Sequence, residues 1–128
     1  MLELHIKGTA ALTVTDGVTA AAVGSGMLPV FATPSMIALI EKAAAESVAA
    51  SLDPGMTTVG TKLDIVHTAA TPVGMAVRAE TELSEIDGRR LVFTVRAFDE
   101  AGEIGSGTHE RFIVNAEKFL AKAEAKKG

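Results

Sequence analysis

One internal segment, residues 33–52, constrains the fold of this chain more than any other. Thr33 followed by Pro34 is typical of a helix start, because a threonine hydroxyl can cap a free backbone N–H and proline fits the first helical position. The Asp-Pro-Gly sequence at residues 53–55 then ends the helix. With about 100° of rotation per residue, the large apolar side chains fall within an arc of about 160°. The sequence therefore predicts one long helix, capped by Thr33, that buries one side.

The apolar arc of this helix contains one carboxylate. Glu41 lies at its edge, on the same side as Met36, Ile40 and Ala44. A buried carboxylate is unfavourable unless a partner compensates for its lost hydration. Two interpretations stay open from the helix alone: Glu41 turns out to solvent at the border of the arc, or it is a paired functional group.

The rest of the chain shows mainly strand signals. Alternating apolar and polar residues, separated by turns such as Asp87-Gly88, predict four strands after the helix. A further strand is predicted before the helix, and the segment rich in Ala, Glu and Lys near the C-terminus predicts a second helix. The strands are predicted at residues 9–15, 57–68, 75–86, 90–98 and 103–115, the C-terminal helix at 116–127, and a helical turn or loop at 18–23.

This element order predicts an α+β fold in which an antiparallel sheet wraps around the long helix. The length of 128 residues is typical of one domain, and we expect a single domain over residues 1–128. A small sheet of this kind often extends its edge by pairing with a second copy. We therefore expect a homodimer.

Composition excludes several classes of function. The net charge of −4 argues against a nucleic-acid surface, and the absence of cysteine excludes disulfides, thiol nucleophiles and thiolate metal sites. Three well-separated histidines offer no metal-ligand spacing, so we expect neither a metal nor another cofactor. Glycine and proline interrupt the apolar residues 18–40, and residues 1–9 lack the apolar region of a signal peptide. We expect no membrane span and a cytoplasmic protein.

Three residues together suggest chemistry. His67 shares a predicted strand face with Leu63 and Ile65, so its imidazole is expected to point toward the helix. A hydroxyl from Thr33, a carboxylate from Glu41 and this imidazole are the parts of a nucleophile, base and orienting group. The helix start beside Thr33 also offers a positive dipole end that stabilises an oxyanion.

Each of these residues also has a purely structural interpretation. Thr33 needs no explanation beyond helix capping, and an inward histidine is more often a hydrogen-bonded core residue than a catalyst. If the site is catalytic, His67 takes a proton either from Thr33 or from a water molecule. Glu41 then fixes the imidazole tautomer or acts as the base itself. The sequence does not choose between these routes.

Four segments resemble one known family. Residues 31–41, 58–61, 66–74 and 107–111 closely resemble the fluoroacetyl-CoA thioesterase-like family, and the similarity extends from about residue 9 to residue 119. Its most specific parts are the Thr33 and Glu41 pair and the sequence His-Thr-Ala-Ala-Thr-Pro that begins at His67.

The resemblance implies a hotdog fold and hydrolysis of a short acyl-coenzyme A thioester. It implies catalytic roles for Thr33, Glu41 and His67, and substrate binding by Gly60 and Arg111. Hotdog thioesterases have their active site at a dimer interface, so the site is expected to take groups from two subunits.

The acyl group is not specified by the resemblance. The best-known member uses aromatic residues upstream of the helix to favour a fluorinated acetyl group, whereas residues 23–28 contain no aromatic side chain. We expect Met27 and Phe31, together with Leu28 and Met36, to shape the acyl pocket. Two other functions stay open: a non-catalytic module that binds or senses acyl-CoA, and a hotdog hydratase or dehydratase. The usual Asp/His pairing of the last class is not evident.

Overall fold

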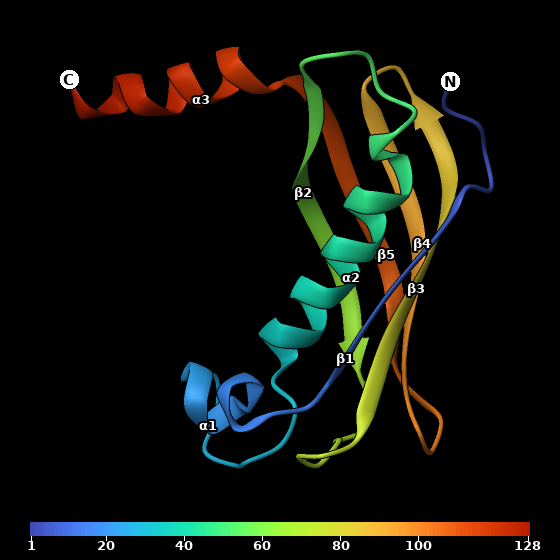
Figure 1. Ribbon diagram of the computed structural model, residues 1–128, viewed down its shortest axis with the longest axis vertical. Helices are drawn as coiled ribbons and strands as arrows, with labels where there is room; N and C mark the ends of the chain where they lie inside the picture. Colours follow the sequence, from blue (N-terminus) through green and yellow to red (C-terminus); the bar gives the residue numbers. More distant parts are fainter.

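The computed structural model describes residues 1–128 and consists of a five-stranded sheet with one long helix against it (Figure 1). Every pair of neighbouring strands is antiparallel, and the strand order is β1-β3-β4-β5-β2. The strands are β1 (Lys7–Thr13), β2 (Met56–His67), β3 (Ala76–Asp87), β4 (Arg90–Asp99) and β5 (Glu103–Asn115). Strands β1 and β2 therefore form the two edges of the sheet.

Three α-helices accompany the sheet. They are α1 (Ala20–Val23), α2 (Thr33–Ala49) and α3 (Ala116–Glu124), with short 3₁₀ turns at Asp16–Val18 and Ala125–Lys127. The predicted order of elements and the α+β class are confirmed. The predicted boundaries are less accurate, since β1 begins two residues before residue 9 and α2 ends at Ala49 rather than near Leu52.

Helix α2 lies across one face of the curled sheet (Figure 1). Its apolar side packs on β1, β3 and β4 and reaches β2 at the sheet edge. The spacing of three and four residues between its buried side chains is that of one helical face. These side chains are Met36, Leu39, Ile40, Ala43, Ala44 and Val48. They meet inward-facing strand residues that include Val77, Leu83, Leu91, Phe93 and Val95.

The start of α2 differs from the prediction. Thr33 is the first helical residue, Ala32 occupies the N-cap position with extended backbone angles, and no side chain caps the helix. The predicted capping role of Thr33 is therefore wrong. Its hydroxyl has another partner, because Oγ1 lies 2.7 Å from Nδ1 of His67.

The predicted alternation along residues 57–68 is also wrong at one point. A β-bulge at Thr61 interrupts the register, since Gly60 pairs with Arg111 while Lys62 pairs with Glu110. A bulge adds one residue and reverses the faces of the residues beyond it. Val59 and Thr61 consequently lie on the opposite face from His67. The prediction that His67 faces the helix is confirmed by its contact with Thr33.

Helix α3 extends away from the sheet (Figure 1). We expected Phe119 and Leu120 to be its packing residues, but they are 47% and 62% exposed, and no residue of α3 is buried. That expectation is wrong within the single chain, because α3 projects past the end of the sheet. None of the helices has the length and apolar character required to cross a membrane.

Strand β1 approaches α2 closely at Gly8. A Cβ atom at this position would collide with the carbonyl oxygen of Ala43 and lie 2.7 Å from both Ser47 Cβ and Thr81 Oγ1. Two of these neighbours are helix atoms held by the packing of α2. The absence of a side chain at residue 8 is therefore what allows β1 to cross the helix at this distance.

We predict that Gly8→Ala lowers the free energy of unfolding by about 1–3 kcal/mol, as expected for overpacking. Urea denaturation at one fixed protein concentration measures this change. Gly17→Ala is the matched control, since a Cβ there meets no atom closer than 4.0 Å, and we expect a change within about 0.5 kcal/mol. Equal stability of the two variants would contradict the close approach.

Candidate active site

The first part of the candidate site is a hydroxyl–imidazole pair. Thr33 is the first residue of α2 and His67 is the last residue of β2. Thr33 Oγ1 lies 2.7 Å from His67 Nδ1, a short hydrogen bond. When Nδ1 is the acceptor, the threonine O–H donates to it. This is the arrangement in which an imidazole can remove the proton of an attacking hydroxyl.

The environment of His67 favours its neutral form. Partial burial lowers the pKa of the imidazole below its ordinary value, and the backbone of Ala69 offsets this only in part. The second ring nitrogen, Nε2, is buried and makes no hydrogen bond of normal length and angle. A neutral imidazole is able to act as a base at neutral pH.

A hollow of about 290 Å³ opens beside this pair. Thr33 and His67 both line it, and Phe31, which is almost completely buried, contributes an aromatic wall. The remaining lining residues are mostly small: Ala20, Ser25, Val30, Thr68, Ala69 and Ala70. Its size is at the lower end of small-molecule sites, so it suits a small group rather than a whole nucleotide-containing ligand.

The start of α2 adds an electrostatic element to this hollow. The helix has 17 residues, and Thr33 stands at its N-terminal end. A helix N-terminus carries a partial positive charge and free backbone N–H groups. Negative charge that develops on an oxygen beside Thr33 is stabilised there.

The second part of the candidate site centres on Arg111. Its Nε donates to Thr58 Oγ1 at 2.8 Å and its Nη2 donates to the Thr58 carbonyl at 3.0 Å. Its Nη1 faces Glu41 Oε2 at 3.4 Å. The side chain of Arg111 is only 8% exposed, whereas that of Glu41 is 36% exposed. The buried guanidinium of Arg111 thus fixes the position of the more exposed Glu41 carboxylate.

The lack of a side chain at Gly60 allows the carboxylate of Glu41 to reach the sheet. A Cβ atom at residue 60 would collide with Glu41 Oε2 and lie 3.3 Å from Arg111 Nη1. Glycine at this position on β2 therefore leaves the space that the carboxylate occupies. The three predicted residues Glu41, Gly60 and Arg111 come together.

A histidine and a threonine that were not predicted for the site complete this second cluster. His109 is fully buried, and it contacts Arg111 Nη1 through Nε2 at 3.2 Å. Thr58 supplies two acceptors to the guanidinium. The sequence signal for Thr58 was hidden by the bulge at Thr61, which places Thr58 and Gly60 on the inner face.

The two parts of the site do not meet within one chain. Thr33 and Glu41 are eight residues apart on α2, which corresponds to about 12 Å along the helix axis. Both parts lie between α2 and β2, one at His67 and the other at Gly60. The predicted grouping of Thr33, Glu41 and His67 is thus divided into a Thr33–His67 pair and an Arg111–Glu41 pair.

Two further predictions concern residues near these pairs. Phe31 lines the hollow as expected. Met27 does not line it and is 92% exposed, so the single chain leaves Met27 without a role in the pocket. No group of three His, Asp or Glu side chains is arranged to hold a metal ion.

This chain is similar in sequence to known thioesterases. A family model described as fluoroacetyl-CoA-specific thioesterase matches residues 14–117. A fluoroacetyl-CoA thioesterase from Streptantibioticus cattleyicolor is 47% identical over 97 residues, which cover 76% of this chain and 70% of the relative.

Solved structures agree with these sequence matches. A mutant of the fluoroacetyl-CoA protein FlK in complex with acetyl-CoA superposes with a TM-score of 0.93 at 37% identity, covering 99% of this chain and 100% of the other. A hot-dog-like protein from Thermanaerovibrio acidaminovorans has the same fold, with a TM-score of 0.89 at 20% identity over 99% and 94% of the two chains. The chain belongs to the fluoroacetyl-CoA-specific thioesterase family, and the predicted hotdog fold and acyl-CoA thioesterase activity are confirmed.

Proposed function

We propose that this protein hydrolyses short acyl-CoA thioesters, with Thr33 as nucleophile and His67 as its base. The observation that carries this proposal is the 2.7 Å contact between Thr33 Oγ1 and His67 Nδ1 inside a small hollow. The thioester carbonyl lies in the hollow, where Thr33 Oγ1 attacks the carbonyl carbon and His67 accepts the hydroxyl proton. The N-terminus of α2 stabilises the oxyanion that forms.

The second half of the reaction returns the enzyme to its starting state. The coenzyme A thiolate leaves and takes the proton from His67, so that the acyl group remains as an ester on Thr33. Water then attacks this ester, and free acid is released. Glu41 accepts the proton of that water, and this proton passes to Thr33 Oγ1 as the ester bond breaks, while Arg111 holds the carboxylate of Glu41 in place. Protein groups and water supply every step, so the proposed route needs no cofactor.

A homodimer brings the separated groups together in this proposal. Strand β2 pairs only with β5, so its other edge is free, and the exposed Leu63 and Val66 lie along it. Antiparallel pairing of two β2 strands about an axis at Asp64 sets Leu63 of one copy opposite Ile65 of the other. Because the bulge makes Thr61 an extra residue, Gly60 of one copy then comes opposite His67 of the other. Glu41, which adjoins Gly60, then faces the hollow of the second copy.

The size of the hollow predicts the substrate range. We expect thiol release from acetyl-, propionyl- and fluoroacetyl-CoA, and a fall of kcat/KM by about tenfold or more for octanoyl-CoA, since the longer chain does not fit. The measurement is thiol release across this panel, with Thr33→Ala as the control for uncatalysed release. Binding of every acyl-CoA without thiol release would contradict the enzymatic activity and would indicate a module that binds or senses acyl-CoA.

Mixed dimers test whether the site is shared. We expect Thr33→Ala and Glu41→Gln to be inactive alone, while a random mixture of the two subunits regains roughly one quarter of the wild-type activity. Half of its dimers are heterodimers, and each of these has one intact site of two. The mixture is made by co-expression with two different affinity tags. A mixture as inactive as its parents would show that both groups act from the same chain.

The pH dependence tests the base. The pKa of His67 is lowered from its ordinary value of 6.5, so the imidazole is still neutral when the pH first falls below 6.5. Activity is present above the pKa of His67 and is lost as the pH falls through it. We expect the acid limb of kcat/KM to have its midpoint below 6.5, and Thr33→Ser to keep that midpoint. A midpoint above 6.5 would contradict the assignment of His67 as the base.

A further inference from the structure

His109 forms a hydrogen bond with a backbone carbonyl next to the β-bulge in β2. At Thr61 the register between β2 and β5 shifts by one residue. The carbonyl oxygen of Lys62, next to the bulge, accepts a hydrogen bond from His109 Nδ1 at 2.8 Å. This contact requires the proton on Nδ1, so Nε2 of the neutral ring is an acceptor.

The acceptor on His109 is aimed at Arg111. Arg111 Nη1 donates to Nε2 at 3.2 Å, and the same nitrogen faces Glu41 at 3.4 Å. The other two guanidinium nitrogens donate to Thr58. Hydrogen bonds to Thr58 and His109 thus fix the plane of the guanidinium, so that Nη1 also points toward the carboxylate of Glu41.

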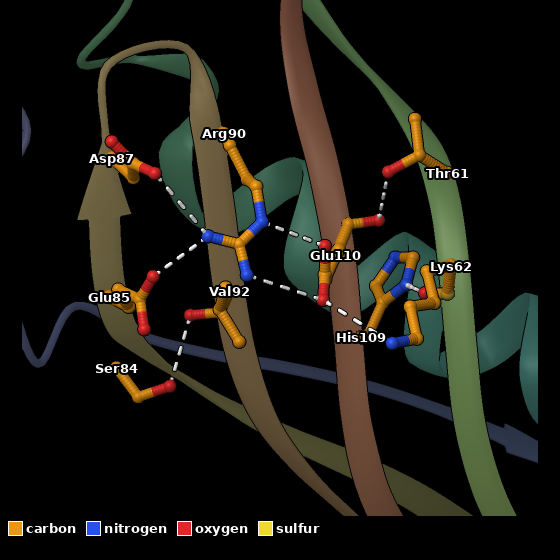
Figure 2. Close-up of polar contacts among 9 residues, drawn as sticks. All are labelled: Thr61, Lys62, Ser84, Glu85, Asp87, Arg90, Val92, His109 and Glu110. Atoms are coloured by element: carbon orange, nitrogen blue, oxygen red, sulfur yellow. Dashed lines mark hydrogen bonds and ion pairs between the residues drawn. The ribbon is translucent and has the colours of Figure 1, made fainter.

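Ion pairs on the outer face of the sheet join β5, which carries His109 and Arg111, to β4 and β3. Figure 2 shows Arg90 between three acids, with Nε 2.9 Å from Glu110 Oε1 and Nη1 2.8 Å from Glu85 Oε2 and 3.7 Å from Asp87 Oδ2. The bulge residue Thr61 donates its hydroxyl to the carbonyl of Glu110 at 3.2 Å (Figure 2). These contacts join β3, β4, β5 and the bulge, while His109 fixes the bulge from within.

We propose that His109 is a positioning residue, whose Nε2 acceptor orients Arg111 toward Glu41 and which must stay neutral to do so. This inference rests on the proposed function, because it assumes that Glu41 acts on the reacting water. His109 itself does not line the hollow that contains Thr33 and His67.

Charges of both signs surround His109, and its burial favours the neutral ring. Arg111 on its own strand, Glu41 on α2, Lys62 on β2 and Glu110 on β5 are the charged residues near it, while β4 contributes the uncharged ring of Phe93 at 6.2 Å. Burial is the main cause that lowers the pKa of His109, and the Arg111 charge acts in the same direction. A proton on Nε2 would remove the acceptor and set two cations against each other.

Two amide variants separate the roles of the two ring nitrogens. In His109→Gln an amide oxygen replaces the Nε2 acceptor, whereas in His109→Asn an amide N–H replaces the Nδ1 donor. We expect His109→Asn to lower kcat by about 10- to 100-fold with little change in KM, since a hydrogen bond to a charged group is lost. His109→Gln should retain kcat within about threefold while unfolding at a lower urea concentration.

A merely structural role predicts the opposite order. In that case His109→Gln, which loses the contact with the bulge, would lose more activity than His109→Asn.

A measurement without turnover separates this inference from the proposed function. ¹⁵N-labelled histidine is observed by NMR in the wild-type protein, and His109→Gln identifies the resonances. We expect His109 to be neutral with its proton on Nδ1 at pH 6.5 and above. A protonated ring or a proton on Nε2 would overturn the inference. Absence of thiol release from every acyl-CoA would overturn the proposed function alone.

Discussion

The structure depends above all on the packing of α2 against the sheet. Burial of its apolar side fixes the rotation of the helix about its own axis, and β1 fits over it only because Gly8 has no side chain. The helix consequently runs along β2 at the sheet edge. Thr33 is then brought to His67 at one end, and Glu41 is brought to Gly60 farther along. The geometry of both candidate groups follows from this one packing arrangement.

Periodicity and turn chemistry were sufficient to predict the fold. The apolar face of α2, the alternation in β3 and the Asp87-Gly88 turn are local signals, and each gave the correct type of element. The inward orientation of His67 was predictable for the same reason, since the residues from Leu63 onward alternate regularly. Local signals of this kind place a side chain on a face, and the family resemblance then indicated which faces carry the chemistry.

The remaining features depend on contacts between distant parts of the chain. Nothing near Thr61 signals the bulge, which arises from the pairing of β2 with β5 and moves Thr58 to the inner face. The cap at Thr33 was mispredicted because the competing partner of its hydroxyl lies 34 residues away. The chain of contacts from Lys62 through His109 to Arg111 likewise joins residues from two strands, and a helical wheel cannot reveal that Glu41 ends this chain.

In the proposed mechanism, Thr33 carries the acyl group between the two steps. Glu41→Gln blocks the second step while leaving the 2.7 Å contact between Thr33 and His67 in place, so the acylated enzyme accumulates. The most direct measurement is mass spectrometry of this variant after mixing with acetyl-CoA, with the double variant Thr33→Ala/Glu41→Gln as control. We expect one acetyl group on the peptide that contains Thr33 and none in the control. An unmodified Thr33 peptide, with thiol release continuing, would show that water attacks the thioester directly and would contradict the nucleophilic role.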